Sequence, residues 1–127
     1  MKVSRMIGRS PPKDVWLKLN TDGAFRASDG MAMAGGLVRD GYSNWVAEFS
    51  AKLGHCSVTY AELWGVHEGL ALAWDLGFRR VQLEVDSQVV VTIIKQDGCR
   101  VAAYSAVADA IREQLHCAWQ VEIKHIF

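Results

Sequence analysis

Residues 15–24 read Val-Trp-Leu-Lys-Leu-Asn-Thr-Asp-Gly-Ala, a run that alternates apolar and polar side chains before it reaches Asp22. Such alternation predicts a half-buried β-strand. Further along the chain, residues 81–85 form a second short apolar run, and another acid, Asp86, follows it directly. If both strands belong to one sheet, their acidic ends lie at the same edge, where α/β proteins place binding and catalytic groups.

A long helical pattern separates these two strands and carries a third acid. Residues 57–76 suit one helix, and Glu62 lies near its start. Gly65, Gly69 and Ala73 follow Glu62 on the same helical stripe. Because glycine costs a helix about 1 kcal/mol relative to alanine, this stripe predicts close packing against another backbone. If that backbone is the sheet, Glu62 points toward the two acidic strand ends.

Three carboxylates at one edge repel one another unless a cation neutralises them. Hard oxygen ligands of this kind suit Mg²⁺ or Mn²⁺, and a divalent metal indicates phosphoryl chemistry. Each acid also has an ordinary structural explanation. Thr59 and Glu62 match a capping box, Asp86 can cap the helix that follows it, and Asp22 can belong to a turn. The metal prediction depends on the three carboxylates converging.

The rest of the pattern predicts a mixed α/β sheet of five strands flanked by helices. Asp29-Gly30 and Asp40-Gly41 are turn signals, so the first three strands form an antiparallel meander, and a helical crossover makes the fourth parallel to the first. Gly77 and Asp97-Gly98 are expected to end helices. The predicted strands are 15–24, 31–38, 44–53, 81–85 and 118–126, and the predicted helices are 57–76, 87–95 and 101–115.

Composition fits one soluble globular domain, because half of the 127 residues are hydrophobic and 22% are charged. Net charge is zero but uneven: residues 1–13 carry four cations and no acid, which leaves ten Lys and Arg against fourteen Asp and Glu in residues 14–127. We therefore expect a basic flexible arm over 1–13 and a folded domain over 14–127. An acidic body is not typical of a strong nucleic-acid binder.

The apolar runs are too short to span a bilayer, and cations interrupt the N-terminal segment, so no signal peptide is predicted. The three cysteines lack metal-like spacing and are interpreted as reduced thiols. These features favour an intracellular protein of the cytoplasm or nucleus. The five tryptophans lie among apolar neighbours, which favours burial over base stacking.

Four motifs in order resemble the type 1 ribonuclease H domain, and among its members the plant, reverse-transcriptase-like branch found in retroelement-derived sequences. The resemblance runs from about Trp16 to the end of the chain. The motifs are Leu19-Asn20-Thr21-Asp22-Gly23-Ala24, Gly35-Gly36-Leu37-Val38-Arg39-Asp40, Ala61-Glu62-Leu63 and Glu84-Val85-Asp86-Ser87.

The resemblance implies an endonuclease that cuts the RNA strand of an RNA–DNA hybrid. Its catalytic, metal-binding acids match Asp22, Glu62 and Asp86, which would hold Mg²⁺, with Mn²⁺ as an alternative. Four further residues are expected to contact substrate. They are Gly23, Ser57, Thr59 and Ser87. Selection of the RNA strand would rest on duplex shape and 2′-hydroxyl groups rather than on base sequence.

The sequence departs from the family pattern at its end. The family has a fourth acid in a helix after the last strand, and this chain stops at Phe127 without such a helix. Asp109 lies in an earlier helix and does not match, and His125 is expected to have a structural role. Activity is therefore expected to be weak or absent. Two alternatives stay open: a non-catalytic nucleic-acid-binding descendant or fragment, and a small α/β ligand-binding domain.

Overall fold

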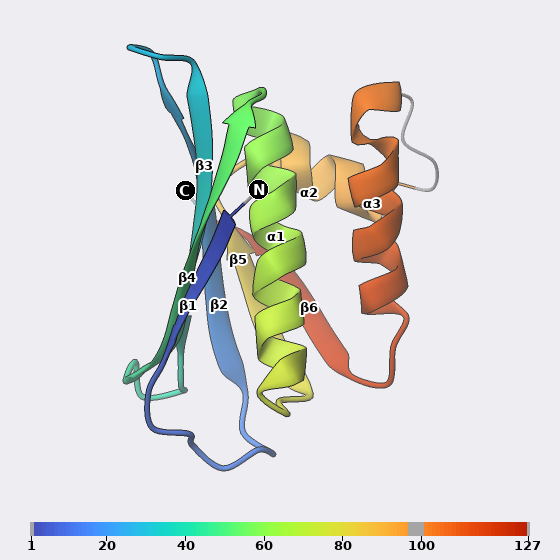
Figure 1. Ribbon diagram of the computed structural model, residues 1–127. Coiled ribbons are helices and arrows are strands. Elements are labelled where there is room, and N and C mark those ends of the chain that lie inside the picture. The colour runs from blue at the N-terminus through green and yellow to red at the C-terminus, as the bar shows by residue number, and fades with distance from the viewer. Residues whose placement is uncertain (1, 97–100, 127) are drawn as a thin grey trace.

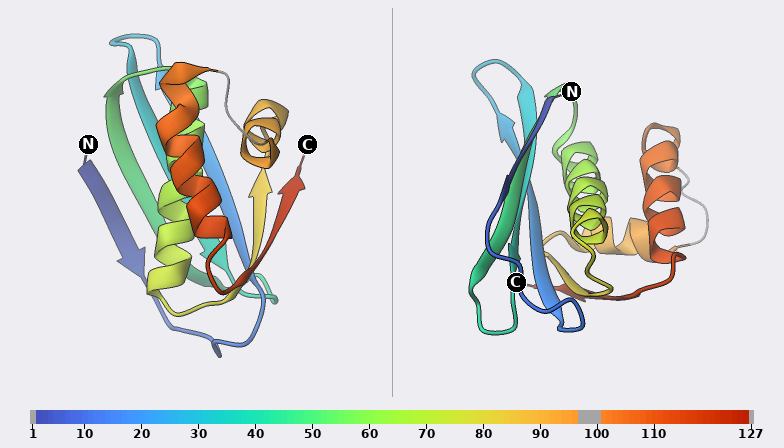
Figure 2. Two further views of the ribbon diagram at one scale, coloured as in Figure 1. Left: turned by 90° about the vertical axis from the view of Figure 1, so that its right-hand side faces the viewer. Right: turned by 60° about the horizontal axis from the view of Figure 1, so that its bottom comes forward.

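The computed structural model describes residues 2–96 and 101–126, which form one mixed sheet with helices packed on one of its faces (Figures 1 and 2). The strand order across the sheet is β1-β4-β3-β2-β5-β6. The strands are β1 (Lys2–Ile7), β2 (Leu17–Arg26), β3 (Met31–Arg39), β4 (Trp45–His55), β5 (Arg80–Val85) and β6 (Gln120–His125). The helices are α1 (Val58–Asp75), α2 (Gln88–Lys95) and α3 (Ala102–Leu115).

The antiparallel meander predicted from the turn signals is confirmed. β2 pairs with β3 and β3 pairs with β4, both antiparallel. Gly30 closes the first hairpin with φ of 71°, a left-handed conformation that glycine adopts without a steric penalty. Gly77 has φ of 90° just after α1 and ends that helix as expected. The predicted stop at Asp97-Gly98 lies outside the described residues.

The parallel join is also confirmed, and it fixes the position of the acids. β5 pairs parallel with β2, from Leu17 opposite Val81 to Thr21 opposite Val85. β6 then pairs parallel with β5 at the edge of the sheet. The helix α1 connects the meander to β5 and runs back along the sheet (Figure 1), so the starts of α1 and α2 both lie near the end of β5.

The expected flexible arm is wrong for Lys2–Ile7. This segment is strand β1, which pairs antiparallel with β4 and gives the described sheet six strands instead of five. Arg5 also binds Asp75 of α1 through a 3.0 Å ion pair. The cations misled the sequence interpretation because an edge strand exposes most of its side chains, so charged residues cost little there.

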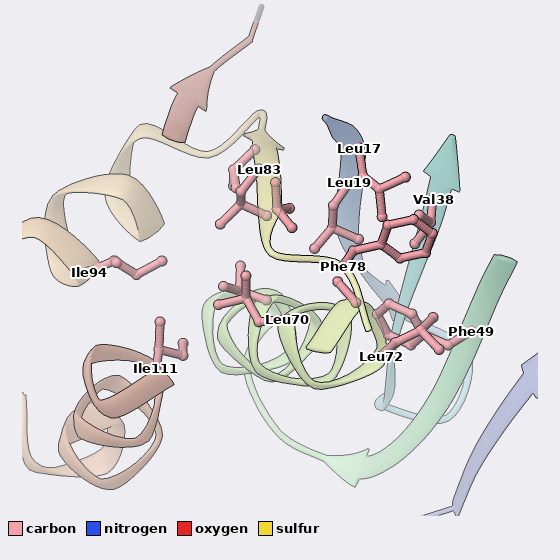
Figure 3. Close-up of a cluster of buried hydrophobic side chains, with 14 of the residues drawn as sticks. Leu17, Leu19, Val38, Phe49, Leu70, Leu72, Phe78, Leu83, Ile94 and Ile111 are labelled. Carbon is pink, nitrogen blue, oxygen red and sulfur yellow. The ribbon is translucent and has the colours of Figure 1, made fainter. Parts of the chain in front are cut away.

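The core lies between the sheet and α1, and α3 packs against the outer side of α1 (Figure 3). In Figure 3, Leu17, Leu19 and Leu83 point from the strands into the core that α1 covers, and these three side chains and Leu70 of α1 are fully buried. Full burial of one such side chain stabilises the fold by about 1.5–3 kcal/mol. This packing holds α1 in a fixed position above the strands that carry Asp22 and Asp86.

No helix in the described parts of the chain combines the length and apolarity needed to cross a membrane. One tryptophan departs from the prediction of burial, because Trp45 is 42% exposed at the start of β4. The β3–β4 register shifts between Val38 and Arg39. This irregularity places Val46 and Ala47, neighbours in sequence, both in the core and turns Trp45 outward.

Candidate active site

The register of β2 and β5 brings the first two acids together. The parallel ladder ends with Thr21 opposite Val85, so the next residues on the two strands are Asp22 and Asp86. Neighbouring strands lie about 4.8 Å apart, which makes these two acids adjacent in space. Both are exposed. Asp22 accepts a 2.9 Å hydrogen bond from the backbone N–H of Gly23.

Glu62 approaches the same edge from α1. A Cβ added to Gly23 would lie 2.6 Å from Glu62 Cγ and 2.9 Å from Glu62 N, so the backbone of β2 touches the helix beside Glu62. Further along α1, a Cβ on Gly65 would lie 3.4 Å from the backbone oxygen of Asp22. The prediction that this stripe packs against the sheet is confirmed. Gly23 has a structural role here that the sequence prediction of substrate contact did not include.

The local structure of α1 corrects the capping-box explanation of Glu62. The N-cap is Ser57, whose hydroxyl accepts a 3.1 Å hydrogen bond from the N–H of Tyr60. Thr59 lies inside the first turn, so Glu62 is not placed to reach back to an N-cap at Thr59. The Ser57 hydroxyl is also 3.2 Å from the hydroxyl of Tyr104 in α3, a contact that the sequence did not predict.

The start of α2 rules out the explanation that Asp86 caps this helix. Ser87 is the N-cap, and its hydroxyl accepts a 3.3 Å hydrogen bond from the N–H of Val90. Asp86 is therefore not the capping residue. Ser87 also hydrogen-bonds Glu62 and thereby links the start of α2 to α1.

Electrostatics at this edge favours the neutral form of Glu62. Burial is the largest cause that raises its pKa, and the charges of Asp86 and Asp22 raise it further. The hydrogen bond with Ser87 acts in the opposite direction. The two aspartates are thus close enough for their charges to act on Glu62. A cation bound among the three would remove this repulsion.

The three carboxylates are not gathered into a finished metal site. Among the described residues, no group of three or more His, Cys, Asp or Glu side chains is arranged so that it could hold a metal ion. Asp22 and Asp86 line a hollow of about 300 Å³, which Asn20, Leu37 and Glu84 also line. Glu62 does not line it, because it comes from the α1 side of β2. In their chemistry the three acids still fit Mg²⁺, which prefers oxygen ligands.

His125 and Asp109 were both expected to lie outside the catalytic group. His125 lies in β6 opposite Val85, and its Nε2 is 3.0 Å from the backbone oxygen of Asp86. This contact ties the last strand to the acidic edge and gives His125 the structural role that we expected. Asp109 lies in α3 and forms a 2.8 Å ion pair with Arg112. It is therefore part of α3 and not of this site.

The sheet order and the helices on one face define a ribonuclease H-like fold. The family described as reverse transcriptase-like matches residues 20–127, and the chain belongs to that family. An Arabidopsis thaliana protein named "Putative ribonuclease H protein" is 42% identical over 126 residues, which are 99% of this chain and 20% of that protein. The chain thus spans about a fifth of the length of that relative.

Solved structures agree with this fold. Ribonuclease H1 from the halophilic archaeon Halobacterium salinarum is 26% identical with a TM-score of 0.78, over 87% of this chain and 85% of that one. LC11 ribonuclease H1, solved in complex with an RNA/DNA hybrid, is 20% identical with a TM-score of 0.77, over 87% of this chain and 84% of that one. At this lower identity the likeness concerns the fold alone.

Proposed function

We propose that this chain is the catalytic domain of a ribonuclease H-type endonuclease, which cuts the RNA strand of an RNA–DNA hybrid and depends on Mg²⁺. The observation that carries this proposal is the β2–β5 register, in which the ladder ends at Thr21 and Val85 and leaves Asp22 next to Asp86. Family membership supports the reaction class. The hybrid bound to LC11 ribonuclease H1 supports the substrate class.

Asp22, Glu62 and Asp86 would hold the Mg²⁺, and Mn²⁺ is an alternative because it takes similar oxygen ligands. When bound, the metal supplies charge neutralisation and Lewis acidity at a phosphate group. Burial is the main cause of the raised pKa of Glu62, and the charges of Asp86 and Asp22 raise it further. That smaller contribution supports a cation site, because it brings the three carboxylates within electrostatic reach of one another. The carboxylates do not form a finished ligand group, so their side chains must adjust when an ion binds.

The starts of α1 and α2 would bind the substrate backbone. Helix N-termini present free N–H groups and partial positive charge, which suit phosphate oxygens. Ser57 caps α1 and Ser87 caps α2, while Thr59 follows in the first turn of α1. These hydroxyl groups, with the backbone at Gly23, are the substrate contacts that we propose.

A labelled RNA–DNA hybrid tests the proposal. We expect slow, Mg²⁺-dependent cleavage of the RNA strand, since no residue of this chain matches the family's fourth acid, with a matched DNA duplex left intact. Asp22→Asn should lower the rate by about 100-fold or more, since loss of even an outer-shell partner of a metal site costs 10–100-fold. Asp109→Asn, which removes an acid from α3, should cleave normally. Cleavage that survives Asp22→Asn, or that needs no divalent cation, would contradict the proposed site.

Metal binding has a separate readout. An ion that binds only the folded protein raises its thermal midpoint, so Mg²⁺ should stabilise the unaltered chain more than it stabilises Asp22→Asn. A second function is favoured by the absence of a finished ligand group among the described side chains: a non-catalytic domain that binds nucleic acid. Hybrid binding without cleavage, together with no stabilisation by Mg²⁺, would favour this second function.

A further inference from the structure

A second hollow lies at the opposite end of the sheet from the acids, where β5 and β6 begin. Its volume is about 570 Å³, and three cations line it: Lys13, Arg79 and Arg80. We call this the cationic hollow. Its other lining residues are Asp14, Gly77, Ala118, Trp119 and Gln120. The wall therefore carries three positive charges and one negative charge, although the chain as a whole is neutral.

None of these three cations forms an ion pair with any residue that the structure describes. Arg79 Nη1 instead donates to the backbone oxygens of Trp74 and Phe78, at 3.0 and 2.9 Å. These oxygens lie at and beyond the last turn of α1, the negative end of its dipole. Capping of α1 therefore accounts for the hydrogen bonds of Arg79 Nη1, but it does not involve the other nitrogens of the guanidinium.

Lys13 and Arg80 follow the same pattern. Lys13 Nζ donates to the backbone oxygen of Leu76 at 2.7 Å and also contacts the hydroxyl of Ser10. Arg80 Nη1 donates to the backbone oxygen of Asp14 at 3.3 Å. These acceptors are neutral carbonyl or hydroxyl oxygens, so the charges themselves are not compensated.

Each arginine retains donors that can bind an anion. Arginine has five N–H groups in a planar fork that matches phosphate oxygens. The Nε and Nη2 groups of Arg79 and Arg80 have no hydrogen-bond partner in the described part of the chain, and Arg79 is half-buried while Arg80 is exposed. Because both arginines line the hollow, these donors can serve a ligand there.

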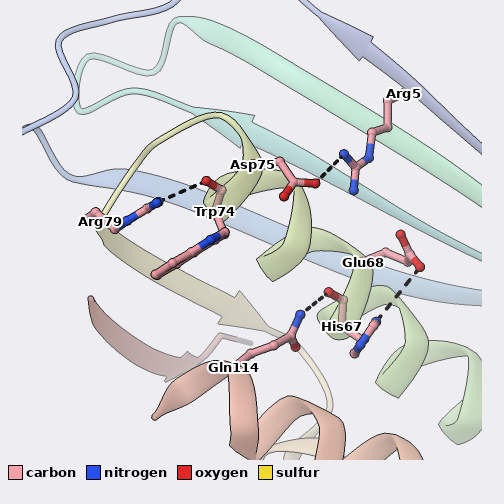
Figure 4. Close-up of polar contacts among 7 residues, drawn as sticks. All are labelled: Arg5, His67, Glu68, Trp74, Asp75, Arg79 and Gln114. Atoms are coloured by element: carbon pink, nitrogen blue, oxygen red, sulfur yellow. Dashed lines mark hydrogen bonds and ion pairs between the residues drawn. The ribbon is translucent and has the colours of Figure 1, made fainter. Parts of the chain in front are cut away.

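Aromatic rings hold two of the cations in place. The guanidinium of Arg79 lies 3.5 Å from the centre of the Trp74 ring (Figure 4). Lys13 Nζ lies 4.3 Å from the centre of the buried Phe78 ring. Cation–π contacts of this kind restrict the side chains before any ligand arrives. Binding then costs less conformational entropy than it would with freely moving lysines.

We propose that the cationic hollow binds the phosphate groups of a nucleic-acid strand, at a site separate from the acidic edge. The partly buried Trp119 offers an aromatic surface for a base beside those phosphates. β5 has six residues, so the hollow lies roughly 20 Å from Asp86. If a duplex passes both sites, one of its strands would place about six phosphates between them, at roughly 3.4 Å each.

The test is independent of cleavage, because binding is measured in EDTA with a labelled RNA strand of about 20 nucleotides, long enough for several phosphate contacts. The variant Lys13→Ala/Arg80→Ala removes two cations but leaves Arg79 on Trp74. The matched control, Lys2→Ala/Lys52→Ala, removes two cations from β1 and β4. At about 0.1 M salt, the first variant should bind roughly 10- to 30-fold more weakly, and its salt slope should fall by about 1.4.

The control should bind as the unaltered chain does. An equal loss in both variants, or no binding by the unaltered chain, would overturn the proposal. If Lys13→Ala/Arg80→Ala fails to fold by circular dichroism, Arg80→Glu alone replaces it, since that exposed side chain makes a single long hydrogen bond. Arg80→Glu that folds and binds normally would also overturn the proposal. Because no divalent cation is present, these outcomes hold whether or not the chain is a nuclease.

Discussion

β5 joins two regions of opposite charge that are built differently. At its start, the cations of the cationic hollow contact backbone oxygens and aromatic rings. At its end, Asp22 accepts one hydrogen bond from Gly23, and the pKa of Glu62 is raised by burial and by the neighbouring aspartates. The positive end is therefore supported by the fold itself. The negative end carries repulsion that a bound cation or protonation of Glu62 removes, as expected where function competes with stability.

The largest expected effect tests how tightly the acidic end is packed. Gly23→Ala places a Cβ 2.6 Å from Glu62 Cγ and 2.9 Å from Glu62 N, so β2 and α1 must move apart. We expect the free energy of unfolding to fall by about 2–3 kcal/mol, measured by urea denaturation. Gly65→Ala is the matched control, because its Cβ would meet no atom closer than 3.4 Å. It should change stability by less than about 1 kcal/mol, since alanine favours helix. An equal loss of unfolding free energy in Gly23→Ala and Gly65→Ala would contradict the prediction.

The next largest effect concerns the cationic hollow, where Arg79 caps α1 and Arg80 contributes mainly its charge. Arg79→Ala removes two backbone hydrogen bonds and the contact with Trp74, and should cost about 1–2 kcal/mol of unfolding free energy. Arg80→Ala should cost less than about 0.5 kcal/mol, as is usual for exposed positions. Arg79→Lys should recover little, because an ammonium group lacks the planar fork. Denaturation of the three variants measures this, and full recovery by lysine would disprove the stacking argument.

The smallest effect depends on pH. Since the pKa of Glu62 is raised above 4.5 in the fold, ionisation of Glu62 opposes folding. Stability from the protonated form is complete below pH 4.5 and is lost as pH rises through the higher folded-state pKa. Glu62→Gln should therefore be more stable than the unaltered chain at neutral pH, by up to about 1 kcal/mol after solvent screening. The gain should vanish at acidic pH. Thermal denaturation of both proteins across pH measures it, and a Glu62→Gln variant that is less stable than the unaltered chain at neutral pH would contradict the prediction.

The fold was largely predictable because its strongest signals are local. The alternation in residues 15–24, the helical stripe at Gly65 and Gly69, and the left-handed glycines at 30 and 77 each act over a few neighbours. The parallel join followed from connection rules, which allow few topologies. The adjacency of Asp22 and Asp86 then required only the register that buries Leu17 and Leu19.

The remaining features depend on contacts between distant residues. Strand β1 forms because β4 offers a free edge and Asp75 offers a partner for Arg5, and neither is visible in residues 2–7 alone. The N-cap is Ser57 and not Thr59, the residue named in the alternative capping-box explanation of Glu62. Both residues can cap a helix, and the path of the chain selects one. Trp45 faces outward because of a register irregularity that no local pattern signals.

The β2–β5 pairing has a consequence for how this domain tolerates change. Side chains alternate along a strand, so a slip of one residue would turn Asp22 toward α1 and bring Thr21 to the opposite face. The apolar residues that lock the pairing, Leu17, Leu19, Val81 and Leu83, therefore also determine which way the acid points. Substitutions deep in the interior can disable the chemistry of the edge while every acidic residue stays unchanged.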